Sequence, residues 1–200
     1  MKMNLPNKLT MLRVIMIPFF VAVMVYSGPQ SRLYAEALST GVMGTYINMR
    51  IIACVIFCAA SFTDFLDGYI ARKNNLVTNF GKFMDPLADK LLVTSALILL
   101  CGEGLLPSWI VIIIVGREFI ISGFRLVASD NGVVIAASWW GKWKTVSQMV
   151  MCILLILPNT VSWLGVWPIR IIIALSVVLT VVSLVDYIVK NIKVITDGGM

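Results

Sequence analysis

The sequence contains no histidine, and this absence removes several kinds of chemistry at once. Ser-His-Asp and Cys-His catalysis both need an imidazole, and so do the common zinc sites. The cysteines lie in or beside apolar runs and form no CxxC pair, so we interpret them as small apolar side chains rather than disulfides or metal ligands. Any acid–base chemistry is left to carboxylates, lysine or tyrosine.

Charge is also scarce, since only 13% of the 200 residues are charged, whereas 60% are apolar and the mean hydropathy is +0.95. These values, with apolar runs recurring along most of the chain, are typical of a polytopic helical membrane protein. The net charge of +6 does not indicate a nucleic-acid partner, because the Lys and Arg residues lie between apolar runs as topology signals do. A basic rim could also attract anionic lipid or a phosphorylated substrate.

The apolar runs predict an all-α integral membrane protein, a single domain over residues 1–200 built as a bundle of six transmembrane helices. We expect the segments 28–45 and 129–144 to be loops. The first span could be a signal peptide, but no small-residue cleavage pattern follows it, so we expect it to be retained. The expected spans are residues 7–27, 46–72, 81–101, 105–128, 145–164 and 169–189.

The basic residues predict the orientation of these spans. If the N-terminus is cytosolic, 13 of the 16 Lys and Arg residues fall on the cytosolic side, and the exceptions are Arg32, Arg50 and Arg170. This is a strong positive-inside bias, and an even number of spans returns the C-terminus to the same side. We therefore expect both termini in the cytosol.

Four of the ten acidic residues fall between Asp64 and Asp89, at an end of the second and third spans. Asp64 and Asp67 are spaced i,i+3, and Asp85 and Asp89 are spaced i,i+4, so each pair shares one face of a helix. A carboxylate within a membrane costs on the order of 2.5–3.5 kcal/mol at the centre of a span. Clustered carboxylates suit Mg²⁺ or Mn²⁺, usually together with substrate phosphates. A solvated, salt-bridged helical hairpin tip is the alternative.

Small residues accompany these aspartates. Gly68 and Ala71 fall on roughly the same helical face as Asp64 and Asp67, and Gly81 is one turn before Asp85. Small residues allow a bulky ligand to approach the backbone closely. They could equally serve helix packing. They are compatible with a pocket but do not establish one.

The stretch has the pattern D-x2-D-G-x2-A-R-x8-G-x3-D-x3-D, which resembles the signature of the CDP-alcohol phosphotransferases. Further similarity to the members that make phosphatidylglycerophosphate lies in NLPNKLTMLR, VTNFGKFMDPLADKLL, GREFIISGFR and AASWWGKWKT. The resemblance covers most of the chain and is weakest in residues 28–45 and in the last span. The positions that carry the pattern are Asp64, Asp67, Gly68, Ala71, Arg72, Gly81, Asp85 and Asp89.

The resemblance implies a homodimeric enzyme of the bacterial cytoplasmic membrane, with its active site at the cytosolic face. The implied reaction transfers the phosphatidyl group of CDP-diacylglycerol to sn-glycerol 3-phosphate and releases CMP, with two Mg²⁺ or Mn²⁺ ions as cofactors and membrane lipid as its surroundings. Another acceptor, such as inositol phosphate or serine, remains an alternative. An aspartate-lined cation transporter is a second alternative, although transporters place such acids at the midplane between repeats.

The resemblance also assigns roles to residues. Asp64, Asp67 and Asp85 hold the metals, and Asp89 completes the second metal site and is the general base. The residues expected to bind the CDP-lipid are Asn7, Thr10, Asp67, Gly68, Ala71, Arg72 and Gly81. Asn7 and Thr10 could instead be the polar start of a helix.

A phosphorylated acceptor needs cations, and Arg117 is the best candidate because it interrupts an otherwise apolar run. Pairing of Arg117 with Glu118 is the structural alternative. Lys142 and Lys144, at the entry to the fifth span, are further candidates for binding the acceptor phosphate. Topology and contact with lipid headgroups explain these two lysines almost as well.

Overall fold

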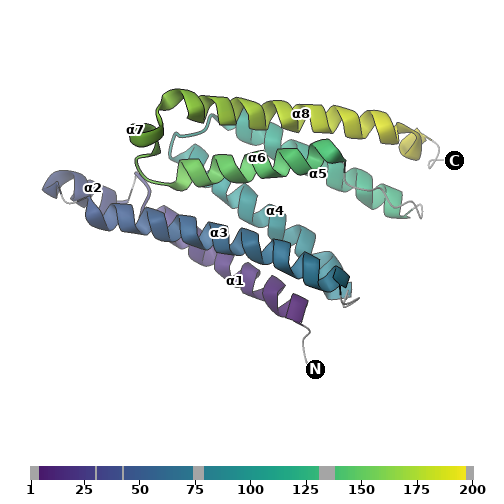
Figure 1. The fold of residues 1–200 in the computed structure, drawn as a ribbon, viewed down its shortest axis with the longest axis horizontal. Helices are drawn as coiled ribbons and strands as arrows, with labels where there is room; N and C mark the ends of the chain where they lie inside the picture. Colours follow the sequence, from purple (N-terminus) through teal and green to yellow (C-terminus); the bar gives the residue numbers. More distant parts are fainter. Residues whose placement is uncertain (1–4, 30, 42, 74–78, 131–137, 197–200) are drawn as a thin grey trace. The chain divides into compact units, whose positions relative to one another are not determined.

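The computed structural model describes residues 5–29, 31–41, 43–73, 79–130 and 138–196, and the regular structure in these residues is entirely α-helical. The all-α prediction is therefore confirmed for this part of the chain. The helices fall into two compact units, which we describe separately (Figure 1). Unit 1 is residues 1–105 with 155–159, and unit 2 is residues 106–154 with 160–200.

Unit 1 contains α1 (Leu5–Tyr26), α2 (Arg32–Thr40), α3 (Gly44–Lys73) and α4 (Asn79–Gly102). Helix α1 packs along both α3 and α4. The rings of Phe20 and Phe57 lie 5.6 Å apart between centroids, and Arg50 reaches the sulfur of Met24 at 3.6 Å. Since later residues of α1 contact earlier residues of α3, these two helices are antiparallel.

The core of unit 1 alternates large and small side chains. Ala53, Phe57 and Ala60 follow one another at about one turn along α3, and all three are 0% exposed. Ala88 and Ala96 are buried on α4 in the same way. Alanines at such positions allow neighbouring helix backbones to approach closely, as is usual between membrane helices.

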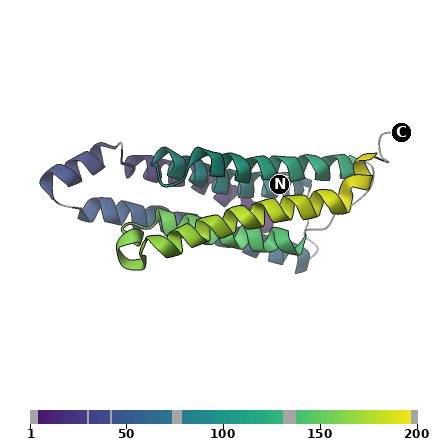
Figure 2. The same ribbon diagram turned by 90° about the horizontal axis from the view of Figure 1, so that it is seen from above.

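Unit 2 contains α5 (Ser108–Asp130), α6 (Trp139–Ile156, whose last two residues belong to unit 1), α7 (Thr160–Leu164) and α8 (Val166–Thr196). Helices α5 and α8 pack together. They run parallel, because Arg117 contacts Ser183 and, further along both helices, the rings of Phe124 and Tyr187 meet edge to face with centroids 6.2 Å apart. Figures 1 and 2 show α7 as a short turn of helix that leads into α8.

Two predicted loops are wrong in part. Residues 28–45 were expected to be a loop, but they contain α2, in which the Ser31 side chain accepts a hydrogen bond from the Tyr34 N–H at 3.1 Å and Gly41 (φ 72°) ends the helix. The flanking glycines obscured this short helical run. Residues 129–144 were also expected to be a loop, but α6 begins at Trp139, where the Ser138 side chain accepts from the Gly141 N–H at 3.1 Å.

The structure also gives other bounds for the expected fifth and sixth spans. The expected span 145–164 is interrupted, because α6 ends at Ile156, two residues before Pro158, and Asn159 adopts a positive φ of 56°. The last helix, α8, starts at Val166 rather than residue 169. Pro168 is tolerated there because it lies in the first turn, where no intrahelical N–H bond is lost.

Within the described residues, three helices are long and apolar enough to cross a membrane: Lys8–Tyr26, Gly44–Thr63 and Val166–Asn191. A shorter apolar helix covers Lys90–Gly102. At 1.5 Å per residue, the 26 residues of the α8 segment would extend about 39 Å, which exceeds the roughly 30 Å hydrocarbon core.

Five of the six tryptophans lie near the starts of the helices α5, α6 and α8, and Trp163 lies in the short helix α7. All six are exposed, from 42% for Trp140 to 73% for Trp167. Trp109 opens α5 and Trp167 opens the parallel helix α8, so these two lie near one end of the unit. Trp139, Trp140 and Trp143 lie in the first turns of α6, which follows α5 in the chain and returns from its other end. Exposed tryptophans at both ends of a bundle are typical of the two membrane–water interfaces.

Candidate functional site

The predicted aspartate motif occupies two consecutive helix ends in unit 1. The last turns of α3 and the first turns of α4 carry it, and the backbone is helical at all of its positions. The predicted i,i+3 and i,i+4 spacings are therefore spacings along real helices. The side chains of these residues, and that of Asn7 in α1, lie outside the described part of the structure: Asp64, Asp67, Gly68, Ala71, Arg72, Gly81, Asp85 and Asp89.

The chain itself keeps these two helix ends near each other. Lys73 ends α3 and Asn79 begins α4, so six residue steps separate them. A fully extended chain of that length spans at most about 22 Å. Since α3 and α4 also pack against each other within unit 1, the two pairs of aspartates lie toward the same end of that unit.

Thr10 and Arg13 are buried in α1, at 1% and 0% exposed. Phe20 packs on Phe57 across the antiparallel pair α1 and α3. Arg13 precedes Phe20 by seven residues, and Asp64 follows Phe57 by seven, so the two backbone positions are at about the same level along the helices. The structure thus places two buried polar side chains of α1 level with the turns that carry the aspartate motif.

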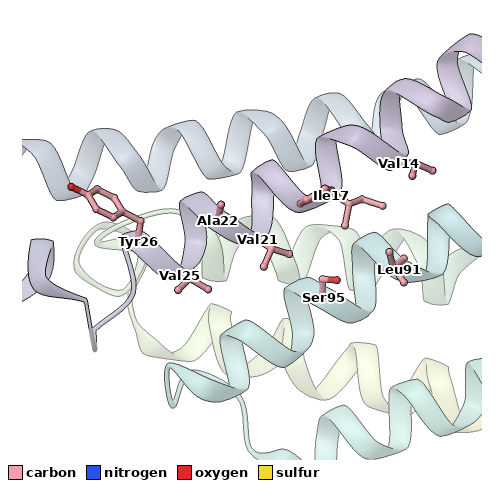
Figure 3. A pocket seen from close by; sticks show the side chains of 9 residues that line it. Val14, Ile17, Val21, Ala22, Val25, Tyr26, Leu91 and Ser95 are labelled. Atoms are coloured by element: carbon pink, nitrogen blue, oxygen red, sulfur yellow. The ribbon is translucent and has the colours of Figure 1, made fainter.

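An apolar groove of about 860 Å³ runs between α1 and α4 (Figure 3). Val14 and Leu91 lie at one end of it, and Leu91 is two residues beyond Asp89 in the sequence. Val25 and Tyr26 lie at the other end of the α1 side. The groove therefore leads away from the helix ends that carry the aspartate motif, and its lining is suited to hydrocarbon. Its remaining lining residues are Ile17, Pro18, Val21, Ala22 and Ser95.

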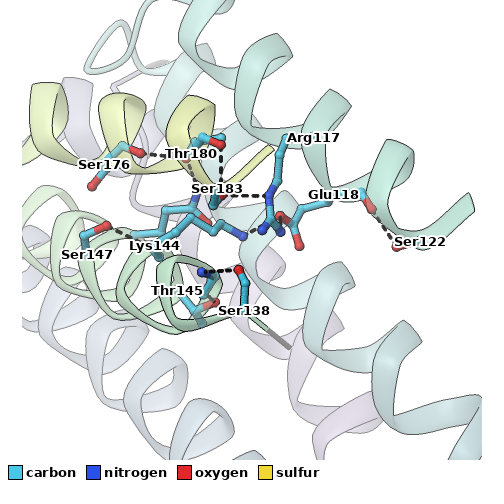
Figure 4. Close-up of polar contacts among 12 residues, drawn as sticks. Arg117, Glu118, Ser122, Ser138, Lys144, Thr145, Ser147, Ser176, Thr180 and Ser183 are labelled. Atoms are coloured by element: carbon cyan, nitrogen blue, oxygen red, sulfur yellow. Dashed lines mark hydrogen bonds and ion pairs between the residues drawn. The ribbon is translucent and has the colours of Figure 1, made fainter. Parts of the chain in front are cut away.

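Unit 2 contains a buried group of charges, formed by Arg117, Glu118 and Lys144, which we call the cation cluster (Figure 4). Arg117 Nη1 donates to Glu118 Oε1 at 2.8 Å. Lys144 Nζ, from α6, donates to the same oxygen. Arg117 Nε donates to Ser183 Oγ of α8 at 3.2 Å. The cluster thus joins three helices through one shared carboxylate oxygen and one serine hydroxyl.

The cation cluster contains two cations, Arg117 and Lys144, and the carboxylate of Glu118. The side chains of Arg117 and Lys144 are only 9% and 4% exposed, and that of Glu118 is 24% exposed. Interactions between charges are stronger in such a partly desolvated place than in water. The cluster is therefore suited to an anion. Pairing of Arg117 with Glu118, the alternative raised by the sequence, does occur, and Lys144 donates to the same carboxylate oxygen.

One edge of Arg117 faces a residue that has no side chain. A Cβ added to Gly141 would lie 3.5 Å from Arg117 Nη2 and 3.3 Å from Ser138 Oγ. Gly141 is in the first turn of α6, where the helix dipole also favours negative charge. Nη2 of Arg117, which is not directed at Glu118 or Ser183, therefore lies beside the backbone at the start of α6.

The structure separates the two lysines that the sequence grouped. Lys144 is 3% exposed and belongs to the cation cluster. Lys142 is exposed, and its Nζ lies 6.0 Å from the ring centroid of Trp139. Two residues along a helix correspond to a rotation of about 200°, so Lys142 and Lys144 point to different sides. Only Lys144 lies together with Arg117.

Sequence reasoning missed a row of buried hydroxyls on α8, which we call the serine–threonine stripe: Ser176, Thr180 and Ser183, each 0% exposed. Ser183 Oγ donates to the Thr180 carbonyl at 2.9 Å. Thr180 Oγ1 accepts from Gln148 Nε2 of α6 at 2.9 Å. The spacing i,i+4,i+7 of hydroxyls in an apolar span was the signal that could have revealed this row.

A second buried ion pair lies in unit 1. Arg50 Nη1 donates to both carboxylate oxygens of Glu103, at 2.7 and 2.9 Å. Arg50 Nε and Nη2 donate to the carbonyls of Ile156 and Leu155 at 3.0 and 3.1 Å. Glu103 lies in the turn after α4, where burial raises the pKa of its carboxyl above the ordinary value and Arg50 opposes that rise.

Among the residues whose side chains the structure describes, no group of three or more His, Cys, Asp or Glu is placed to hold a metal ion. The aspartate motif lies outside those residues. Its donors are nevertheless all carboxylate oxygens, which are the ligands that Mg²⁺ and Mn²⁺ accept. The donor set therefore fits a hard divalent cation.

Comparisons with known proteins agree with the sequence pattern. Residues 3–184 match the family described as CDP-alcohol phosphatidyltransferase. A Bacillus subtilis (strain 168) protein named CDP-diacylglycerol--glycerol-3-phosphate 3-phosphatidyltransferase is 44% identical over 189 residues, 94% of this chain and 95% of that protein. A Mycobacterium tuberculosis protein named probable phosphatidylglycerophosphate synthase is 38% identical over 98% of this chain and 85% of its own. A Haemophilus influenzae protein with the same name as the Bacillus subtilis protein is 43% identical over 75% of this chain and 74% of its own length.

Proposed function

Since the chain belongs to the CDP-alcohol phosphatidyltransferase family, we propose that it transfers the phosphatidyl group of CDP-diacylglycerol to sn-glycerol 3-phosphate. The products are phosphatidylglycerophosphate and CMP, so the enzyme is a transferase of phospholipid biosynthesis. The names of relatives that are 44% and 38% identical over nearly the whole chain support this acceptor. In the structure, the observation that carries the proposal is the cation cluster, which brings Arg117 and Lys144 together from two helices, because two neighbouring cations fit an acceptor that bears a phosphate.

The aspartate motif is the proposed donor site. Asp64, Asp67, Asp85 and Asp89 would hold two divalent ions, Mg²⁺ or Mn²⁺. Bound there, such ions would neutralise the pyrophosphate and stabilise the departing CMP. The chain contributes these carboxylates from two helix ends that meet at one end of unit 1, so the helices fix the positions from which the ligands come.

The cytidine part of the donor would lie along α3 and the start of α1. Thr10, which is 1% exposed and level with the motif, supports this placement. The proposed contacts are Asn7, Thr10, Asp67, Gly68, Ala71, Arg72 and Gly81. The apolar groove beside Leu91 provides space for an acyl chain of the same lipid.

Asp89 is the proposed general base. It would accept the proton of the acceptor hydroxyl as the oxygen of that hydroxyl attacks the phosphorus of the donor. A carboxylate is a weak base, so orientation of the two substrates must contribute a large share of the rate. The acceptor would be oriented through its phosphate by Arg117 and Lys144, with Lys142, at the entry to the fifth span, a further candidate.

We further propose a multi-pass protein with six spans, forming one membrane domain over residues 1–200, that acts as a homodimer in the bacterial cytoplasmic membrane. The excess of Lys and Arg on one side supports cytosolic termini and an active site on the cytosolic face. The exposed tryptophans at both ends of unit 2 support insertion of that unit across the bilayer.

The purified protein should release CMP from CDP-diacylglycerol when Mg²⁺ or Mn²⁺ and sn-glycerol 3-phosphate are present. The measurement compares this acceptor with inositol phosphate, serine and glycerol at equal concentration. Release that is fastest with glycerol 3-phosphate supports the proposal. No release with glycerol 3-phosphate, or faster release with serine, would overturn it.

The same assay tests the role of Asp89. We expect Asp89→Asn to abolish turnover, because the amide cannot accept the proton, while binding of the CDP-lipid largely survives. Turnover close to that of the unchanged protein would remove Asp89 from the base role.

A further inference from the structure

We propose that Ser183 of α8 is a positioning residue for the acceptor. It orients Arg117 so that Nη2 of the guanidinium faces the acceptor phosphate. This inference rests on the proposed function, in which Arg117 binds that phosphate. Neither the sequence pattern nor the family signature between Asp64 and Asp89 includes Ser183.

The hydrogen bonds of Ser183 give it a fixed direction. Its hydroxyl donates to the Thr180 carbonyl at 2.9 Å, so the hydrogen is committed to the backbone of α8. The lone pairs of Oγ are then left for Arg117 Nε, which donates to them at 3.2 Å. Since Ser183 is 0% exposed, water does not compete for this contact. The serine therefore acts as a rigid acceptor for one edge of the guanidinium.

This contact decides which edge of Arg117 remains for a ligand. A guanidinium has five N–H donors in a planar fork. Ser183 engages Nε, and Glu118 engages Nη1. Nη2 makes no hydrogen bond to a described residue, and it lies beside Gly141, which has no side chain. A phosphate that approaches there would meet a guanidinium already held in one orientation, and less freedom is lost on binding to a group that is held in advance.

The serine–threonine stripe positions the second cation as well. Thr180 accepts a hydrogen bond from Gln148, which is one turn after Lys144 on α6. The stripe thus fixes both helices that carry the cations, α5 through Ser183 and α6 through Thr180. Its third member, Ser176, is equally buried, but no contact of its hydroxyl reaches the cation cluster. Ser176 therefore provides a matched control on the same face of α8.

The test compares Ser183→Ala with Ser176→Ala in the purified full-length protein, with glycerol 3-phosphate and CDP-diacylglycerol varied in turn. We expect Ser183→Ala to raise the KM for glycerol 3-phosphate about tenfold, the ratio that corresponds to one hydrogen bond made by a charged group. The KM for CDP-diacylglycerol and kcat should change less than about twofold, because orientation of Arg117 affects acceptor binding alone. Ser176→Ala should leave all three constants unchanged.

Two variants keep the test decisive. Ser183→Thr retains the hydroxyl and should restore the acceptor KM. Ser183→Cys keeps the volume but offers only a weak acceptor, and it should shift the acceptor KM in the same direction as alanine if the alanine protein does not fold. A merely structural role predicts equal losses for both substrates in these variants, and that outcome, or an unchanged acceptor KM, would overturn the inference. If the unchanged protein fails to release CMP with glycerol 3-phosphate, the proposed function itself is wrong, which is a distinguishable result.

Discussion

Each compact unit buries an arginine against a glutamate, but the two arginines differ in how their donors are used. Arg50 in unit 1 directs Nε, Nη1 and Nη2 to acceptors of the protein, and its charge is balanced by Glu103 alone. Arg117 in unit 2 donates to the same oxygen of Glu118 as Lys144 does, and its Nη2 lies beside Gly141 without a hydrogen bond to a described residue. Both side chains are at most 9% exposed, so burial does not distinguish them.

The difference indicates two kinds of buried charge. A balanced pair whose donors are all engaged has no capacity for a ligand, and it fixes the helices that carry it. In the cation cluster, two cations share one carboxylate oxygen, and Nη2 of Arg117 makes no hydrogen bond to a described residue, so that nitrogen can still donate to a ligand. The use of the arginine donors therefore separates a structural ion pair from a candidate anion site, and the following predictions test that distinction.

The largest effect is expected at Arg50. Replacement by methionine leaves Glu103 buried without its cation, and removing one partner of a buried pair typically costs about 3–5 kcal/mol of folding stability. For a chain of this length, that loss corresponds to a fall of roughly 10 °C in the midpoint of thermal inactivation in detergent micelles. At low temperature, the KM for glycerol 3-phosphate should be unchanged.

Two controls follow from the same pair. The double variant Arg50→Met with Glu103→Leu should recover much of the lost stability, because apolar replacements leave no buried charge. In the single variant, burial of Glu103 is no longer opposed by Arg50, so the folded-state pKa of Glu103 lies further above its unfolded value. The missing stability should therefore return as the pH falls and be lost again as it rises. A single variant as stable as the parent would contradict the structural assignment.

The next effect is expected at Arg117. We expect Arg117→Ala to raise the KM for glycerol 3-phosphate by about 10- to 100-fold, because a charged hydrogen bond to the phosphate is lost. The KM for CDP-diacylglycerol should stay nearly constant. Arg170→Ala is the matched control, since Arg170 is exposed and lies 5.9 Å from the ring centroid of Trp167. Equal rises for both substrates would count against Arg117 as an acceptor ligand.

The smallest effect is expected at Gly141. Alanine there would place a methyl group 3.5 Å from Arg117 Nη2, so it should partly cover the open edge and raise the acceptor KM about threefold, a cost of less than 1 kcal/mol. The same methyl group would lie 3.3 Å from Ser138 Oγ, so Ser138 must shift slightly, and we expect little change in stability because alanine is the better helix former. Gly123→Ala is the control, as a Cβ at Gly123 meets no atom within 4 Å. An acceptor KM that is unchanged in Gly141→Ala would show that the phosphate does not use this edge.

The sequence was sufficient for much of the helical framework, because long apolar runs and basic flanks are local features. It was not sufficient at the start of α6, where three tryptophans and Gly141 concealed a helix that is capped by Ser138. With those residues taken as a loop, Lys142 and Lys144 had no assigned faces and were treated alike. Once the helix is extended to Trp139, the periodicity alone separates the two lysines.

The contacts across the fold were harder to predict. Arg50 was counted only as a topology signal, because its partner Glu103 is 53 residues away and nothing local links the two. Ser183 was passed over because a single serine in an apolar helix is unremarkable by composition. The adjacent pair Arg117 and Glu118 was recognised as an alternative, but the position of Lys144, which brings a second cation to the same carboxylate oxygen from another helix, depends on tertiary structure.

The buried hydrogen bonds of Arg50 also have a consequence for the order in which the chain folds during synthesis. At a synthesis rate of about 5–20 residues per second, Glu103 emerges roughly 3–10 s after Arg50, and Leu155 follows after roughly 5–20 s in total, being 105 residues downstream. Arg50 can therefore be neutralised by Glu103 well before the carbonyls at the end of α6 exist. In this order, α3 and α4 are joined first around an arginine with unused donors. The carbonyls at the end of α6 are then the last acceptors that Arg50 meets, so the order of synthesis gives this arginine its carboxylate partner before its carbonyl partners.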